Sequence, residues 1–287
     1  ILGRSRLVRS ASVGIVTPAA QQALRVSGRV LDFLGRHAAG SAAVLFGLVV
    51  PFLVGYGGLR LYGLFTSRPL APALKGIPVD LLFSFLRVAM GVLVSVAVSI
   101  PLANWIVRRV KWRSAALAII QILASIPATA FFPVVVILLT WGLGMNAGAV
   151  LLALTTMFWY VLFNVVGAAS AIPKEVQEAA FAFGLRGRRY LRRVFLPAVL
   201  PSLVTGCITA WGAGWNALIL CEYLEAGRRV YQVRGIGATL DRATYHTGDM
   251  QVVAASLASM VLLIILVNRF FWDPLYQRVA ERYKMEA

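Results

Sequence analysis

The most regularly spaced polar residues of the chain lie between two long apolar stretches, in residues 174–201. A Glu-Ala-Ala triplet is followed at fixed intervals by a glycine and a Leu-Pro pair; the members are Glu178, Ala179, Ala180, Gly184, Leu196 and Pro197. Alanine and glutamate favour a helix, whereas glycine loosens it and proline ends one helix or opens the next. The pattern therefore predicts two short helices around a break. Its chemistry would be polar contact at a membrane face, not catalysis.

Two charged residues lie within otherwise apolar stretches, where a charge is unfavourable. An arginine at the centre of a membrane helix costs about 2.5–3.5 kcal/mol, and less near a helix end. We expect Arg87 either to extend its guanidinium group toward the membrane surface or to pair with Glu222 inside a helix bundle. A carboxylate within a membrane is a functional candidate by default. For Glu222, structural pairing is at least as well supported as contact with a solute.

Prolines and polar side chains mark a candidate pathway. Pro127 and Pro133 interrupt the backbone hydrogen bonds of one apolar stretch. Within a membrane such breaks are tolerated only where protein or a water-filled cavity satisfies the freed groups. This stretch is therefore expected inside the bundle. Asn164 and Asn216 add polar groups to neighbouring stretches, where they either line the cavity or hydrogen-bond one helix to another.

The sequence contains no motif for catalysis or cofactor binding. The phosphate-binding pattern G-x-x-x-x-G-K-[ST] is absent, as are G-x-S-x-G and H-E-x-x-H. Cys207 and Cys221 would lie about 21 Å apart on one helix, too far for a disulfide, and His37 and His246 lack metal-ligand spacing. We expect no catalytic residue, cofactor or metal site. If ATP drives this protein, another polypeptide must bind it.

The composition is that of an integral membrane protein. The chain has 287 residues, of which 60% are apolar and 14% charged, whereas soluble domains carry about 25% charged residues. A bilayer core needs about 20 apolar residues per helix. Six stretches meet this requirement, at about 39–59, 80–107, 115–141, 147–170, 199–224 and 250–272. We therefore predict an all-α integral membrane protein with about six transmembrane helices.

The charges orient these helices. The net charge is +17, with 28 Lys and Arg residues against 11 Asp and Glu. A basic excess can indicate nucleic-acid binding, but here the arginines cluster between apolar stretches, as the preference for positive charge on the cytoplasmic side requires. The lipid bilayer, and no nucleic acid, is the expected partner. Most basic residues fall on the inner side when both termini and residues 174–201 are cytoplasmic.

The spacing E-A-A-x3-G-x9-V-x-L-P resembles the EAA loop of ABC-importer permeases, with Val194 where isoleucine is commoner. Further similar stretches are SFLRVAMG, QILASIP and ALILCEYLEAG. Together they make residues from about 80 to 275 similar to the nitrate/sulfonate/taurine/bicarbonate branch of these permeases. The resemblance implies a type I importer permease in a bacterial inner membrane. It also implies that the EAA loop, at about 172–198, forms a coupling helix that docks on a cytoplasmic ATPase subunit.

The resemblance further implies a second permease subunit or fused half, an extracytoplasmic solute-binding protein, and a small anion or sulfonate-type solute. Residues 39–287 would form the permease domain, and residues 1–38 a basic linker or amphipathic surface helix. Residues 225–249 carry four arginines on the predicted outer side. They form either a partly buried loop with its own ion pairs or a surface for a binding protein or an anionic solute.

The alternative function is that of a secondary transporter or channel without an ATPase. It requires carboxylates deep within the helices, and only Glu222 comes close; the sequence also lacks an evident inverted repeat. A membrane scaffold whose basic loops bind lipid head groups would leave the EAA spacing unexplained.

Overall fold

The computed structural model describes residues 52, 55–60, 62–66, 69, 71–108, 113–226 and 228–283. The chain divides into two compact units, residues 1–68 and 69–287. In the first unit, residues 55–60 and 62–66 are helical. The linker expected at 1–38 and most of the first expected span, 39–59, lie outside the described residues. The second unit contains the features that follow.

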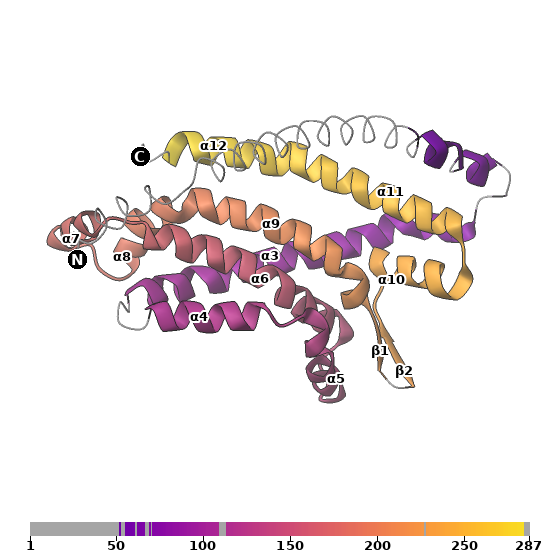
Figure 1. Ribbon diagram of the computed structural model, residues 1–287, viewed down its shortest axis with the longest axis horizontal. Coiled ribbons are helices and arrows are strands. Elements are labelled where there is room, and N and C mark those ends of the chain that lie inside the picture. Colours follow the sequence, from indigo (N-terminus) through magenta and orange to yellow (C-terminus); the bar gives the residue numbers. More distant parts are fainter. Residues whose placement is uncertain are drawn as a thin grey trace, which may run out of the picture. The chain divides into compact units, whose positions relative to one another are not determined.

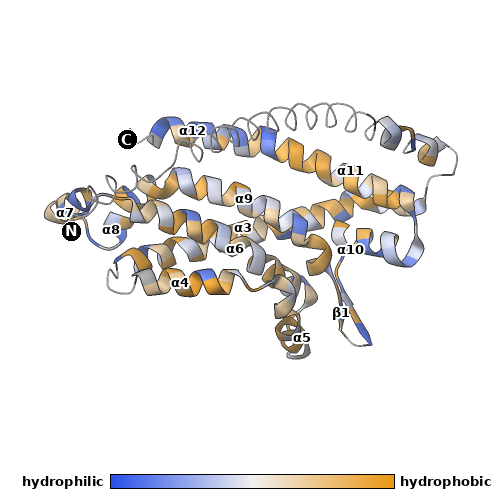
Figure 2. Cartoon of the chain, in the orientation of Figure 1, coloured by the Kyte–Doolittle hydropathy of each residue, from blue (hydrophilic) through white to orange (hydrophobic). Residues whose placement is uncertain are grey.

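Four helices of the described residues are long and apolar enough to cross a membrane: Pro72–Arg108, Met145–Ser170, Arg188–Glu222 and Met250–Arg282. They contain α3 (Ile77–Arg108), α6 (Met145–Ser170), α9 (Leu196–Glu222) and α11 (Met250–Val267), and the first also contains the short 3₁₀ helix η1 (Pro72–Gly76). Figure 2 shows hydrophobic residues along these helices and hydrophilic ones on α12 (Asp273–Tyr283). The predicted helical membrane fold is confirmed, and a bent pair brings the number of spans to as many as five.

Small residues allow the central helices α3, α6 and α9 to pack closely. A Cβ added to Gly214 of α9 would come within 2.9 Å of Met157 Sδ on α6 and of Val88 Cγ1 on α3. One added to Gly206 would lie 3.0 Å from the Cβ of Asn164. In a membrane, where lipid is as apolar as a side chain, such close approach of helices is a main source of their association.

The fifth apolar stretch is broken rather than straight. It consists of α4 (Arg113–Ala124), the 3₁₀ turn η3 (Ala128–Phe131) and α5 (Phe132–Thr140). Its two halves are bent by 87°. Pro127 lies at the break with ψ 146°, an extended conformation that ends a helix. Pro133 does not break a helix, contrary to the sequence expectation: it lies in the first turn of α5, where the missing N–H has no intrahelical partner to lose.

The connecting elements gather at opposite ends of the bundle (Figure 1). At one end, α7 (Lys174–Ala182) and α8 (Arg188–Tyr190) join α6 to α9, and the π-helical turn η4 (Leu191–Phe195) leads into α9. At the other end lies an antiparallel hairpin, β1 (Tyr223–Ala226) and β2 (Arg229–Gln232). The chain after the hairpin forms α10 (Ile236–Asp241), the π-helical turn η5 (Arg242–Thr247) and α11; a second π-helical turn, η6 (Asn268–Trp272), joins α11 to α12. The hairpin is the one pair of strands among the described residues.

Candidate functional site

The segment with the Glu-Ala-Ala triplet forms a short helix at the end of the bundle. α7 begins after Pro173, three residues beyond the end of α6. Ala180 is buried and belongs to the apolar core, whereas Glu178 and Ala179 are exposed. One face of α7 therefore rests on the ends of the spans. The opposite face presents a carboxylate next to a small side chain.

The predicted break after α7 is confirmed, and a glycine makes it. Gly184 has φ +71°, in the left-handed region that favours glycine. The N–H of Leu185 donates to the carbonyl of Ala180 at 2.9 Å, and the N–H of Gly184 donates to that of Phe181 at 3.0 Å. These bonds satisfy carbonyls at the helix end, as in a glycine-capped C-terminus. A Cβ at Gly184 would meet nothing within 4 Å, so the requirement is conformational rather than steric.

The second half of the loop continues directly into a span. The helix runs without a gap from Arg188 to Glu222, and Leu196 and Pro197 open α9 immediately after the π-helical turn. Phe181 of α7 stacks on Tyr190 with ring centroids 5.5 Å apart, and the Arg108 guanidinium lies over the same tyrosine ring at 4.9 Å. These contacts fix α7 to α8 and α8 to the end of α3.

Exposed charges surround α7. None of them takes part in an ion pair within the described part of the chain. They are Lys174, Glu175, Glu178, Arg186, Arg188, Arg189, Arg192 and Arg193. This end of the bundle therefore offers a polar surface whose charges remain available to another protein.

A groove of about 560 Å³ opens where the α4–α5 pair is broken. Pro127 and Asn216 both line it, as the sequence suggested for a pathway. Pro133 and Asn164 do not lie among its lining residues. The Asn164 amide instead donates to the backbone carbonyl of Tyr160 at 2.8 Å, a local bond within α6.

The two intramembrane charges pair near the hairpin end of the bundle. Arg87 Nη1 lies 2.6 Å from Glu222 Oε1, and the two residues are 7% and 0% exposed. Pairing inside the bundle, not extension toward the membrane surface, is therefore the outcome for Arg87. The Glu222 carboxylate also accepts from Ser84 Oγ at 2.7 Å and from the N–H of Gly237 at 2.8 Å. It joins α3, α9 and the start of α10.

The same cluster also hydrogen-bonds the backbone segment that leads into α10. Arg87 Nη2 donates to the carbonyl of Arg234 at 2.7 Å, and Ser84 Oγ accepts from the N–H of Ile236 at 2.8 Å. A Cβ on Gly235 would overlap the Glu222 carboxylate, so glycine permits this close approach. Sequence reasoning missed Ser84. Its position three residues before Arg87, on the same helix face, was the available signal.

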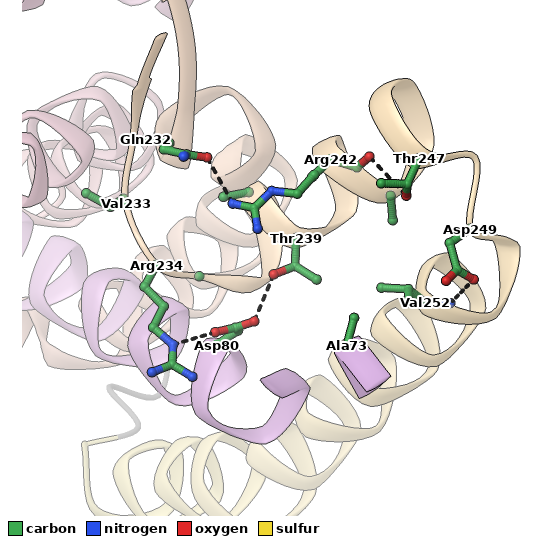
Figure 3. Close-up of a pocket in the computed structure, with 13 residues that line it drawn as sticks. Ala73, Asp80, Gln232, Val233, Arg234, Thr239, Arg242, Thr247, Asp249 and Val252 are labelled. Carbon is green, nitrogen blue, oxygen red and sulfur yellow. Dashed lines mark hydrogen bonds and ion pairs between the residues drawn. The ribbon is translucent and has the colours of Figure 1, made fainter. Parts of the chain in front are cut away.

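A second cavity, of about 710 Å³, lies beside this cluster and is shown in Figure 3. Asp80 accepts from Arg234 Nε and from Thr239 Oγ1, each at 2.8 Å. Arg242 donates to Gln232 Oε1 at 3.0 Å, and the Asp249 carboxylate caps the first turn of α11. Residues 225–249 are thus partly buried, with Arg234 in an ion pair to Asp80 of α3, as the first expectation required. Arg228 and Arg229 of the same segment are exposed, so a surface for a binding protein or an anionic solute stays a prediction.

Titratable groups also meet between the hairpin and η5. Tyr223 Oη lies 2.9 Å from His246 Nε2 and donates to Glu225 Oε1 at 2.8 Å, while Asp241 Oδ2 is 3.7 Å from the same imidazole nitrogen. The hydrogen bond to Glu225 raises the pKa of Tyr223, and partial burial raises that of Asp241. Within the described residues, no group of His, Cys, Asp and Glu side chains has the arrangement of a metal site.

The sequence that forms this architecture matches a known protein family. The model of the family described as "Binding-protein-dependent transport system inner membrane component" matches residues 91–281, from α3 to α12. The chain belongs to this family. The resemblance drawn from the spacing of residues 178–197 is confirmed, and this permease is a multi-pass membrane protein.

Curated relatives of this permease are identical to it at between a quarter and a third of the aligned residues. A putative ABC transporter permease of Methanocaldococcus jannaschii is 29% identical over 66% of this chain and 67% of its own length. A nitrate import permease of Synechococcus elongatus is 26% identical over 53% of each chain. A putative aliphatic sulfonates permease of Escherichia coli is 30% identical over 55% of this chain and 57% of its own. The matches thus span about half to two thirds of these relatives.

Solved structures show the same fold. A subunit of a methionine ABC transporter in an inward-facing conformation superimposes with a TM-score of 0.59 at 19% identity, covering 74% of this permease and 99% of that chain. A chain of a bacterial ABC transporter that imports alginate gives a TM-score of 0.59 at 16% identity, covering 87% and 99%. The fold of this permease is therefore that of ABC-importer permeases.

Proposed function

We propose that this chain is the transmembrane subunit of an ATP-driven importer and that α7 is its coupling helix, docking on a separate cytoplasmic ATPase subunit. The observation that carries the proposal is the geometry of α7. The helix stands at the end of the spans, exposes Glu178 and Ala179, and ends at a glycine in the left-handed conformation. The charges around it make no internal ion pairs in the described residues.

α7 is suited to transmit force because it is tied to the spans on both sides. Residues 171–173 connect it to α6, and residues 183–187 connect it to the helix that begins at Arg188. The buried Ala180 and the Phe181–Tyr190 stack restrict its motion relative to the bundle. When ATP binding draws two ATPase subunits together, a displacement of α7 would therefore move α6 and α9.

The distribution of basic residues between the two sides of the membrane supports positions for the remaining parts of the proposed importer. Most basic residues lie on the side of α7 when this side is cytoplasmic. α12, which ends the described chain, reaches the same end of the bundle (Figure 1), which supports a cytoplasmic C-terminus; the N-terminus is proposed to lie there too. A second copy or a fused half would complete the pathway, and a solute-binding protein would dock at the hairpin end.

The proposed solute is a small anion or a sulfonate-type compound. Relatives named for nitrate, bicarbonate and aliphatic sulfonates support this range. Another relative, 30% identical over 55% of this chain, is named for riboflavin transport. The names agree on import of small solutes and differ in the chemistry of the solute.

A secondary transporter or channel is less well supported. Such a protein needs a coupling carboxylate that faces the pathway. Glu222 is fully buried in its ion pair and does not line the groove at the α4–α5 break. No Asp or Glu side chain lines that groove among the described residues.

Copurification tests the proposed coupling. We expect an ATPase subunit to copurify with the wild-type chain in detergent and to be lost with Gly184→Asp or Glu178→Lys. Glu281→Lys, the same charge change on exposed α12, is the control and should retain the ATPase. Membrane insertion should be unchanged in all variants. If the ATPase still binds both loop variants, α7 is not the coupling helix.

A further inference from the structure

The groove at the α4–α5 break lies between α6 and α9. Its floor on α6 runs from Thr155 to Phe163, near the middle of that helix, and its wall on α9 runs from Ala213 to Leu220, close to the end of that helix at Glu222. The third side is the broken backbone at 124–128. A solute that crosses the membrane beside these helices would therefore pass the groove.

The groove must hold polar atoms. A chain bent by 87° at the depth of the hydrocarbon core leaves carbonyl and N–H groups without helical partners. Such a break is tolerated only where the backbone is buried in protein or lines a water-filled cavity. Lipid chains are therefore unsuitable occupants, because they would leave these backbone groups unsatisfied.

The lining of the groove is uncharged and mostly apolar, with a few polar side chains. None of its lining residues is Asp, Glu, Lys, Arg or His. Pathways selective for anions are commonly lined by Arg or Lys side chains. Arg87, the intramembrane cation of α3, is engaged with Glu222 elsewhere and does not line the groove. A bare inorganic anion would find no opposite charge here.

The side chains present suit an organic molecule. Trp159, Tyr160 and Phe163 contribute aromatic surface along one side of α6. The Asn216 amide and the Tyr160 hydroxyl form no hydrogen bond with any described residue and can both donate and accept. The hydroxyls of Thr155 and Thr156 donate to backbone carbonyls at 2.7 and 2.8 Å, which leaves their oxygens as acceptors.

The size of the groove agrees with this chemistry. Its volume, about 560 Å³, falls within the range of about 300–1,000 Å³ that is typical of sites for small organic ligands. Such sites combine a mainly apolar and aromatic wall with a few polar groups that orient the ligand. An ion of a few atoms would fill only a small part of this space.

We infer that the groove is a solute site for an uncharged organic molecule with an aromatic or other flat apolar body, oriented by Asn216 and Tyr160. This inference rests on the proposed importer function and departs from its anionic solute range: the organic body, not an anionic group, is what the membrane site recognises. Inorganic anions such as nitrate are not retained there.

Cysteine labelling in lipid nanodiscs tests the inference on the full chain. Ala213→Cys places a thiol on the groove wall, and Gly212→Cys places one on the neighbouring position, outside the lining, where an added Cβ meets nothing within 4 Å. The native cysteines, Cys207 and Cys221, are buried and give little background. The probes are benzamide, an uncharged aromatic amide, benzenesulfonate, which has the same ring with a negative charge, and sodium nitrate.

We expect benzamide to slow the reaction of a neutral methanethiosulfonate reagent with Ala213→Cys and not with Gly212→Cys. Benzenesulfonate should protect less than benzamide, and nitrate should not protect. Adding Tyr160→Phe should weaken protection by benzamide about two- to tenfold, the effect of one lost hydrogen bond. Protection by nitrate or benzenesulfonate equal to that by benzamide would overturn the inference, as would no protection by benzamide.

The result of this labelling test can be distinguished from that of the copurification experiment, which tests the proposed function. Copurification of the ATPase depends on α7, at the end of the bundle, and Ala213→Cys should leave it unchanged. If the ATPase copurifies while benzamide gives no protection, the importer proposal stands and the assignment of the groove fails. If benzamide protects but no ATPase copurifies, the assignment of the groove stands and the proposed coupling to an ATPase fails.

Discussion

At the scale of single residues, the Arg87–Glu222 pair is the most consequential feature of the membrane region. The ion pair joins two residues that lie 135 positions apart in the sequence. Removing one partner from a buried ion pair leaves an uncompensated charge and typically costs about 3–5 kcal/mol. The sequence identified both residues as candidates for pairing, because they are charges within apolar stretches. It did not identify Ser84 and Gly237, which complete the bonds to the carboxylate.

Glu222→Gln should therefore lower the thermal stability of the purified permease strongly, by about 3–5 kcal/mol, because Arg87 stays charged and buried. Glu281→Gln, on exposed α12, should change it little. The double variant Arg87→Gln with Glu222→Gln should lose less than the sum of the two single variants, as expected for groups in contact. Unfolding curves in one detergent measure all four; additive losses would mean that the pair is not coupled.

A second residue prediction concerns Gly235. Its φ of 174° is extended and suits any residue, so only space argues for glycine. A Cβ there would overlap the Glu222 carboxylate, and crowding of this kind costs about 1–3 kcal/mol. Gly235→Ala should lower the melting temperature of the permease, whereas Gly212→Ala, with open space around it, should not. Equal melting temperatures would show that the carboxylate can move aside without cost.

At the scale of elements, the loop after α7 depends on backbone conformation. A non-glycine residue in the left-handed region costs roughly 1–2 kcal/mol, and asparagine tolerates this region better than most. Gly184→Asn should therefore keep most of the ATPase copurification, and Gly184→Val should reduce it, although neither side chain meets a neighbour within 4 Å of its Cβ. Quantitative immunoblotting of the copurified ATPase distinguishes them. Equal loss with both would point to a contact rather than to the turn.

At this scale, the sequence predicted the positions of the helices along the chain more accurately than their directions in space. Four expected spans lie within a few residues of α3, α6, α9 and α11, because long apolar stretches leave little choice of structure. Pro127 indicated a broken helix but not a bend of 87°, since a missing hydrogen bond fixes no direction. Pro133 was misassigned because a proline in the first helical turn and one in a helix interior look alike in an apolar sequence.

At the scale of the whole molecule, the permease separates its tasks in space. The surface around α7 lies at one end of the bundle and the Glu222 cluster near the hairpin, while the uncharged groove reaches from the middle of α6 to the last turns of α9. The sequence could predict the first of these from spacing. It indicated two residues of the groove, Pro127 and Asn216, but not its other lining residues, whose proximity arises only from helix packing.

One helix connects these regions. The segment from Arg188 to Glu222 comprises 35 residues, which at a helical rise of 1.5 Å gives a rod about 50 Å long. Its first turn adjoins the proposed ATPase contact, and its last residue is fixed to α3 and α10. If the rod pivots as a lever about its fixed end, a tilt of about five degrees displaces the free end by about 4 Å. A small rotation that barely disturbs the ion cluster would then suffice for a stroke nearly as long as one helical turn.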